Sequence, residues 1–383
     1  MKVGIMSMQR VINYGSYMQA LSLKTMLEEL GHDVVFVDYK ARPSIQHQRS
    51  VSYWLRRGKQ AIKNTGLVWT AANLYRGRPI GYRPVKTYTA DELAFIPALK
   101  ELGVDYDHFH YHTQVDALII GSDEVFNCLQ NADKVGFSPE LFGVHNRANL
   151  LLSYAASFGN TTLERLEEYG VSKQVGGWLK RFDFLSVRDE NSAQIVKALT
   201  GKEAQQHLDP ALLGGIENMQ WEGNSEKAYL AVYAYPKRIT NTEGAEIVAF
   251  AKKNELRVLS LAGAQNFPDF ENVTPPCTPL QILPYFRNAA CVVTDTFHGA
   301  IFSIINHIPF AVFCRRPKDV SYSNSEKLVD LLIKLNLTDR LVSDENDLDT
   351  ILGREIDFAA VDAIRAEGRL AAMDYLKQAL EGS

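Results

Sequence analysis

The sequence predicts an α/β fold of two Rossmann-like domains that face each other across a central cleft, followed by a long C-terminal helix. Short β-type apolar runs alternate with helical patterns along most of the 383 residues. The alternation restarts after a Gly-rich, polar stretch at residues 213–227. Strand–helix alternation is typical of parallel sheets with helices on both faces. A chain of this length can form two domains, each with its own core.

In the first half, apolar residues at helical spacing predict a helix at residues 17–30, which stops at Gly31. A second helix is predicted at residues 190–199. Strands are predicted where short apolar runs lie between turn residues, at 2–6, 34–37, 117–120, 150–155 and 184–187.

The second half repeats this pattern. Its predicted helices are 242–253 and 300–306, and its predicted strands are 229–233, 257–261, 291–293 and 310–313. A long helical pattern follows at 358–380. We therefore divide the chain into an N-terminal domain at 1–213, a C-terminal domain at 214–357 and a C-terminal helix at 358–383.

Composition narrows the class of protein. Apolar residues make up 46% and charged residues 22%, as in ordinary soluble proteins, and the net charge of −4 argues against a protein dedicated to nucleic acid. The start, MKVGIMSMQR, lacks the pattern of a signal peptide, and no apolar run is long enough to span a membrane. Four scattered cysteines indicate a reducing compartment and no zinc knuckle. We expect a cytoplasmic protein without a metal site.

Polar residues follow several predicted strands, where ligands bind in doubly wound sheets. Gly15, in the stretch from Asn13 to Ser16, allows close approach to the backbone, and Ser16 can cap the next helix. Such a helix start suits a phosphate or carboxylate, although a plain cap with a turn glycine explains the same residues. Neither G-x-G-x-x-G nor a Walker loop is present, which disfavours a nicotinamide enzyme.

Charged residues follow two further strands. Asp123 and Glu124 can serve as acid, base or hydroxyl acceptors, or they can be the acidic first turn of a helix. Arg188 offers a planar fork that matches phosphate or carboxylate. A structural salt bridge to Asp189, or to another carboxylate, is the alternative.

A polar elbow at residues 295–299 interrupts the apolar segment VVTDTFHGAIFSIINHIPF. Asp295 or Thr296 can cap the following helix, which places His298 in its first turn. Gly299 removes a side chain where another group must come close. A histidine satisfied by local capping is the alternative interpretation.

Several segments of the sequence occur in an order that resembles the polysaccharide pyruvyl transferase family. They are NYGSYMQALSLKTMLEELG, GSDEVF, SYAASFG, SVRDENS, LDPALL and TDTFHGAIFSIINHIPF, and the resemblance spans residues 2–340. It implies a GT-B-like fold. It also implies transfer of a pyruvyl unit from phosphoenolpyruvate to a sugar of a bacterial-type polysaccharide, such as an exopolysaccharide, or of a lipid-linked glycan. The products are a pyruvate ketal and phosphate, and no cofactor is needed beyond phosphoenolpyruvate as co-substrate.

The resemblance also implies roles for the candidate residues. His298, Asp123 and Glu124 are the catalytic candidates, with His298 on phosphate or acting as general acid and Asp123 and Glu124 near the acceptor hydroxyls. The donor-binding candidates are Arg188, Thr296, His298, Gly299, Lys327, Asn13, Gly15 and Ser16. Some family members carry a basic residue where this chain has Thr296. Positive charge must then come from Arg188, Arg315, Arg316 or Lys327.

From residue 39 to residue 90 the chain has eleven Lys or Arg and no Asp or Glu, with Trp and Tyr spread among them. The segment fits an anionic acceptor, such as a glycan on a lipid pyrophosphate at the inner face of an anionic membrane. A solvated basic surface and a grip on single-stranded nucleic acid are the alternatives. We assign acceptor binding to Asp123 and to Arg56, Arg57 and Lys59.

Two other functions remain open beside the pyruvyl transferase. A nucleotide-sugar-dependent GT-B glycosyltransferase would use the same fold, with His298 on a diphosphate. A glycan-binding protein with a decayed site is the third possibility. Partners are therefore expected to be phosphoenolpyruvate and a sugar or lipid-linked oligosaccharide, and not nucleic acid.

Overall fold

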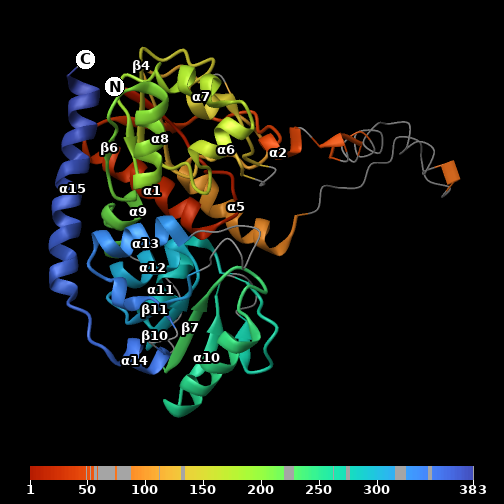
Figure 1. Cartoon of the computed structure of the whole chain (residues 1–383), viewed down its shortest axis with the longest axis vertical. Coiled ribbons are helices and arrows are strands. Elements are labelled where there is room, and N and C mark those ends of the chain that lie inside the picture. The colour runs from red at the N-terminus through yellow and green to blue at the C-terminus, as the bar shows by residue number, and fades with distance from the viewer. Residues whose placement is uncertain are drawn as a thin grey trace.

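A computed structural model of the chain describes residues 1–48, 50–51, 53–55, 58, 74–75, 88–111, 113–130, 134–219, 228–261, 263–272, 277–314, 325–343 and 347–382. Two parallel β-sheets with helices packed against them form its framework (Figure 1). The predicted α/β class with two Rossmann-like halves, arranged as in the GT-B fold, is confirmed.

The first sheet belongs to the first half of the chain and has the strand order β2-β1-β3-β4-β5-β6. All of its strands are parallel. They are β1 (Lys2–Met6), β2 (Asp33–Phe36), β3 (Ala117–Asp123), β4 (Leu150–Ala156), β5 (Ser186–Val187) and β6 (Gln205–Gln206). The central strands β3 and β4 are buried along their whole length, as expected when helices cover both faces.

The second sheet has the order β11-β10-β7-β8-β9, and its strands are also parallel. They are β7 (Tyr229–Tyr233), β8 (Arg257–Ser260), β9 (Phe270–Asn272), β10 (Cys291–Thr294) and β11 (Phe310–Val312). The proposed domain boundaries at 213/214 and 357/358 stay predictions. The two sheets are separated by the interval between β6 and β7, part of which lies outside the described residues.

Helices connect the strands in both halves (Figure 1). In the first half they are α1 (Tyr14–Glu29), α2 (Ile45–Gln48), α5 (Ala90–Leu102), α6 (Leu163–Glu168), α7 (Ser172–Leu179), α8 (Glu190–Thr200) and α9 (Pro210–Leu213). In the second half they are α10 (Asn241–Lys253), α11 (Ile282–Arg287), α12 (Phe297–Ile305), α13 (Ser325–Lys334), α14 (Leu348–Gly353) and α15 (Phe358–Glu381). Single 3₁₀ turns are η1 (Pro139–Phe142), η2 (Ile216–Asn218), η3 (Pro279–Gln281) and η4 (Thr338–Arg340).

Element boundaries differ from the prediction mainly at polar residues. Helix α1 begins at Tyr14 because Asn13 is its cap and accepts the Ser16 N–H at 3.1 Å, so the prediction that Ser16 caps this helix was wrong. Strand β3 continues through Asp123, which pairs with Ala156 of β4. The alternative in which Asp123 and Glu124 open a helix is therefore wrong.

The apolar core is continuous between the two halves. One cluster of buried side chains includes residues from β1 and α1 together with residues from β7 and α12. Two smaller clusters cover the other face of each sheet and stay within one half. The expectation that each domain has its own core is therefore correct for one face of each sheet only.

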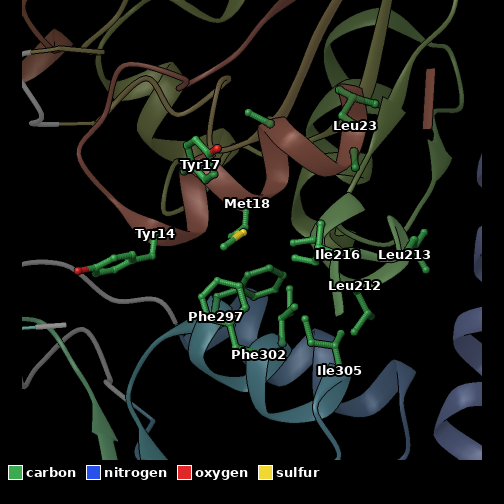
Figure 2. Close-up of a cluster of buried hydrophobic side chains, with 14 of the residues drawn as sticks. Tyr14, Tyr17, Met18, Leu23, Leu212, Leu213, Ile216, Phe297, Phe302 and Ile305 are labelled. Atoms are coloured by element: carbon green, nitrogen blue, oxygen red, sulfur yellow. The ribbon is translucent and has the colours of Figure 1, made fainter. Parts of the chain in front are cut away.

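Helices α1, α9 and α12 make the contact that joins the halves. Figure 2 shows Tyr17 and Met18 of α1 above Phe297, Phe302 and Ile305 of α12, with Leu212 and Leu213 of α9 to one side. Met18, Leu212 and Phe302 have no exposed surface. Burying such side chains stabilises the folded chain by roughly 1.5–3 kcal/mol each, so this apolar contact holds the two halves together.

Helix α15 returns from the second half to the first and appears in blue along one side of the molecule (Figure 1). Near its start, Phe358 stacks on His307 at 4.8 Å between ring centroids. Near its end, the Tyr375 hydroxyl donates to the Ser153 carbonyl of β4 at 2.7 Å. The predicted C-terminal helix therefore contacts both halves and connects them.

The shared core predicts that both halves unfold together. Met18→Ala removes a fully buried side chain between α1 and α12, and we expect it to lower the free energy of unfolding by about 2–5 kcal/mol. Calorimetry should show one transition for the native chain and one, shifted down, for the variant. Leu370→Ala on α15 is the control, because Leu370 is 68% exposed and its loss should change stability by about 0.5 kcal/mol or less. Two separate transitions in Met18→Ala would contradict the shared core.

The packing of α15 should depend on pH through His207. This ring lies 4.7 Å from the Tyr375 ring, and burial lowers the pKa of His207 to about 4. Because an unfolded histidine has a pKa of about 6.5, the unfolded chain binds the proton first as the pH falls. The stabilisation is therefore complete above pH 6.5 and is lost as the pH falls towards 4.

We expect stability to fall by about 1–2 kcal/mol from His207 alone between pH 7 and pH 5. His207→Asn should remove this part of the pH dependence in urea unfolding, whereas His145→Asn at an exposed histidine should leave it intact. An unchanged pH dependence in His207→Asn would show that the ring is not the titrating group.

Candidate functional site

The candidate site lies where the carboxyl ends of both sheets meet. Strand β3 ends at Asp123, Arg188 follows β5, and Asp209 precedes α9. From the second half, the start of α12 brings His298 against the start of α1. Residues far apart in the sequence are therefore brought together at one place, as expected for ligand sites in parallel sheets.

Gly15 and His298 are in direct contact. A Cβ atom built on Gly15 would lie 2.0 Å from Nδ1 and 2.2 Å from Cγ of the His298 ring, which no real side chain tolerates. The glycine in the first helix is therefore required by the histidine of the other half. The structure places both predicted residues in one site.

Hydrogen bonds at the start of α12 account for Thr296. Its hydroxyl accepts the Gly299 N–H at 2.9 Å and lies 3.0 Å from the hydroxyl of Thr294. Thr294 donates its only proton to the Tyr233 carbonyl, at 2.7 Å, so Thr296 must donate to Thr294. The capping role is therefore confirmed, and the hydroxyl has no proton left for a phosphate, which speaks against the predicted donor-binding role.

Gly299 serves the same local packing. Its Cβ would lie 2.1 Å from the Thr294 hydroxyl oxygen and 2.7 Å from that of Thr296. The expectation that a group comes close to this glycine is met by Thr294. Its donor-binding role stays a prediction.

Arg188 is 3% exposed and lies between two carboxylates of its own half. Its Nη1 donates to Asp209 at 2.5 Å, and its Nη2 is 3.7 Å from Asp123. The alternative of a salt bridge is thus confirmed, but with Asp209 and Asp123 as partners. The guanidinium also lies 4.3 Å above the Phe297 ring at the start of α12. Nε and Nη2 are buried without a hydrogen-bond partner among the described residues, so donors remain for a ligand.

Asp209 joins Arg188 to the candidate histidine. Its Oδ2 is 3.8 Å from Nε2 of His298, which is longer than a hydrogen bond, and its Oδ1 accepts the Ala211 N–H. Burial opposes ionisation of this carboxyl, but His298 and Arg188 outweigh it and hold the pKa of Asp209 well below its usual value. Asp209 is therefore a fixed negative charge.

Asp123 has an uncommon backbone conformation, with φ of 73° at the end of β3. Residues other than glycine rarely adopt this region, and strain of this kind gathers at functional sites. Its Oδ2 accepts the Ser16 hydroxyl at 2.8 Å, which ties β3 to the start of α1. Ser16 thus positions the carboxylate, and the structure brings these two predicted residues together.

Glu124 and Lys327 form an ion pair between the two halves. Glu124 is 3% exposed and also accepts from the side-chain amide of Asn127 at 2.7 Å. The Cβ of a residue at Gly159 would come within 2.5 Å of this carboxylate. Glu124 is therefore held tightly, and of the two predicted carboxylates Asp123 is the one with fewer contacts.

A further arginine, Arg238, lies beside the start of α12. Its Nε is 3.0 Å from Oδ2 of Asp295, the residue before the helix cap. Asn13, the predicted residue that caps α1, donates to the Tyr235 hydroxyl at 3.4 Å and so connects the halves here. Arg238 was not predicted, and nothing in its local sequence marks it.

Sequence reasoning also missed Asp209. The only signal was its position in LDPALL, where an aspartate before a proline is a helix-start signature. Of the predicted residues, the structure brings Asn13, Gly15, Ser16, Asp123, Glu124, Arg188, Thr296, His298, Gly299 and Lys327 to one region. Arg56, Arg57, Lys59, Arg315 and Arg316 lie outside the described residues.

Two absences hold for the part of the chain that the structure describes. There, no group of three or more His, Cys, Asp or Glu residues is arranged to hold a metal ion. In the same residues no helix has the length and apolar character to cross a membrane.

The contact between Gly15 and His298 can be tested by substitution. Gly15→Ala should displace the ring or separate α1 from α12, at a cost of about 1–3 kcal/mol in unfolding free energy. Gly177→Ala on α7 is the matched control, because a Cβ there meets nothing within 4 Å and alanine favours the helix by up to about 1 kcal/mol. Equal stability of the two variants in thermal unfolding would show that the ring moves away freely.

Comparison with known proteins gives the following picture. No curated protein is significantly similar in sequence. Among solved structures, UDP-GlcNAc 2-epimerase from Neisseria meningitidis bound to UDP-GlcNAc has 9% identity, a TM-score of 0.45 and coverage of 100% of both chains. The S. aureus MnaA–UDP structure has 11% identity, a TM-score of 0.45 and coverage of 99% of this chain and 97% of that one. An O-GlcNAc transferase mutant from Thermobaculum terrenum has 13% identity and a TM-score of 0.42, with 99% and 66% covered.

A family model gives a match over most of the sequence. It covers residues 13–313, from the cap of α1 to the residue just after β11. These residues include Asp123, Arg188, Asp209 and His298, which meet in the site. The model is that of polysaccharide pyruvyl transferase, and the chain belongs to this family.

Proposed function

We propose that the chain transfers a pyruvyl unit from phosphoenolpyruvate to two hydroxyls of one sugar in a polysaccharide or lipid-linked glycan, with release of phosphate. The observation that carries the proposal is the meeting of Arg188 and His298 at Asp209. Nε and Nη2 of Arg188 and Nε2 of His298 are buried without a hydrogen-bond partner among the described residues. Family membership supports transferase chemistry on a polysaccharide.

The donor is a small, strongly anionic molecule. Its phosphate or carboxylate fits the Nε and Nη2 groups of Arg188, since a guanidinium binds such groups through two parallel hydrogen bonds. The N-terminal end of α12 adds favourable electrostatic potential for the same anion. Asp209 accepts from Nη1, and Asp123 lies 3.7 Å from Nη2, beyond hydrogen-bond distance, so Nε and Nη2 keep their protons for the ligand.

The reaction can be balanced without a further reactant. A proton added to the methylene carbon of phosphoenolpyruvate makes a methyl group and leaves a cationic carbon at C2. One sugar hydroxyl adds to C2 and loses its proton. A second hydroxyl of the sugar then displaces phosphate from C2, closes the ketal and loses its proton. Of the two protons released, one replaces the proton used and one leaves with phosphate.

Two side chains are placed for these proton transfers. His298, whose side chain is 12% exposed, is the candidate general acid for the methylene carbon or the leaving phosphate. Asp123 is the candidate base for a sugar hydroxyl. Asp209 acts through His298 and Arg188 and is a positioning residue. Glu124, fixed by Lys327, supports the acceptor side.

The acceptor side draws on the basic segment at residues 39–90. Its net positive charge fits an anionic, lipid-linked acceptor, because each basic residue near an anionic membrane contributes about 1 kcal/mol. Arg56, Arg57 and Lys59 are our candidates for this contact. Peripheral association with the inner face of a cytoplasmic membrane follows from the same charge.

Incubation with phosphoenolpyruvate and a panel of glycan acceptors should release inorganic phosphate and add a pyruvate ketal, detected by mass spectrometry. We expect His298→Asn, which keeps hydrogen bonding but cannot titrate in this range, to lower turnover by roughly 10²–10⁴. Arg188→Ala should instead weaken donor binding by roughly 10- to 100-fold, as for a lost charge-assisted contact.

His145→Asn, at an exposed histidine, is the matched control and should leave turnover unchanged. Nucleotide sugars serve as the competing donors. Nucleotide release from a sugar nucleotide, without phosphate release from phosphoenolpyruvate, would replace the proposal by a glycosyltransferase. Binding of glycans with turnover of neither donor would indicate a decayed site.

A further inference from the structure

Arg238 lies at the carboxyl edge of the second sheet, next to the α12 start. It follows β7, and β7 is the neighbour of β10 in the sheet. The ion pair with Asp295, at 3.0 Å, fixes its side chain beside the residues that lead from β10 into α12. An arginine in this position faces the same helix start as His298.

The loop that carries Arg238 also reaches the first half of the chain. Tyr235 in this loop accepts a hydrogen bond from Asn13 at 3.4 Å, and the Arg238 guanidinium lies 5.3 Å from the centre of the Tyr235 ring. Asn13 caps α1 and is two residues from Gly15, which contacts His298. Arg238 therefore belongs to the same inter-domain site as the predicted donor residues.

The guanidinium of Arg238 is only partly satisfied. The side chain is 16% exposed, and its Nε and Nη2 are buried without a hydrogen-bond partner among the described residues. The contact with Asp295 neutralises its charge, but it does not use these donors in hydrogen-bond geometry. Buried donors of this kind are costly unless a ligand or water completes them.

The hydroxyl of Thr296 cannot donate a hydrogen bond to a bound anion, because it donates its proton to Thr294. We propose that Arg238 binds an anionic group of the donor and supplies positive charge at the start of α12, where Thr296 has none. The proposal rests on the proposed function, since it takes phosphoenolpyruvate as the donor. The phosphate or carboxylate would bridge Arg238 and the first turn of α12.

A purely structural role for Arg238, as the counter-charge of buried Asp295, is the competing explanation. Asp295 has no exposed side-chain surface, so removal of its partner alone would destabilise the fold. The double variant Arg238→Ala/Asp295→Asn separates the two roles. It removes both charges and should recover the stability lost in Arg238→Ala.

The experiment measures thermal unfolding and calorimetric binding of phosphoenolpyruvate for the native chain, Arg238→Ala, Arg238→Lys and the double variant. We expect affinity to fall by about 10- to 100-fold in Arg238→Ala and to stay low in the double variant although stability returns. Arg238→Lys should fall between, because lysine keeps the charge but loses the planar fork. Arg257→Ala, at an exposed arginine of β8 paired with Glu271, is the control and should bind normally.

Native affinity in the double variant, or in Arg238→Ala, would overturn the proposal and leave Arg238 as the counter-charge of Asp295. If the native chain itself fails to bind phosphoenolpyruvate, the proposed function fails and inorganic phosphate becomes the probe. Phosphate binding that is lost in both Arg238→Ala and the double variant would then still support an anion site at Arg238. Equal phosphate binding, or none, in the native chain and the variants would overturn it.

Discussion

The packing of α12 against α1 and α9 is the contact on which the rest of the molecule depends. Helix α1 connects strands of the first sheet and α12 connects strands of the second, yet Met18 of α1 and Phe302 of α12 are fully buried in one continuous core. The same helices begin at the candidate site, with Gly15 on one and His298 on the other. The apolar contact therefore sets the distance between the two halves of the site. Separating the helices would expose this core to water, at roughly 25 cal/mol per Å² of apolar surface.

Buried charges at the site are balanced against one another. Three basic side chains face four carboxylates; the basic ones are Arg188, Arg238 and Lys327, and the carboxylates are Asp123, Glu124, Asp209 and Asp295. Buried ion pairs contribute little net stability because desolvation offsets their attraction. Their presence here fits a site that binds an anion. The carboxylates hold the basic side chains in place, while N–H groups of Arg188 and Arg238 have no hydrogen-bond acceptor among the described residues.

Contacts at several points connect the two halves and restrict their movement relative to each other. Glu124 pairs with Lys327, Asn13 bonds to Tyr235, and α15 runs from the His307 contact back to β4. These contacts surround the shared core on more than one side. A wide opening of the two sheets would have to break these contacts. Two separate sheets are present, but one continuous apolar core runs through both halves.

The sequence by itself predicted most strands of both sheets, though not the short edge strands β6 and β9, and it predicted most of the site. Strand–helix alternation is a local pattern, and polar residues at strand ends mark positions such as Arg188 and His298 because the carboxyl ends of parallel strands share an edge. Only the tertiary structure decided the partners. Gly15 contacts His298, the Thr296 hydroxyl donates to Thr294, and Arg238 is held at the site by its ion pair with Asp295. These contacts join residues distant in the chain, or depend on which hydroxyl donates, and no local spacing encodes them. Helix α5 was missed for a local reason, because Pro97 interrupts its pattern.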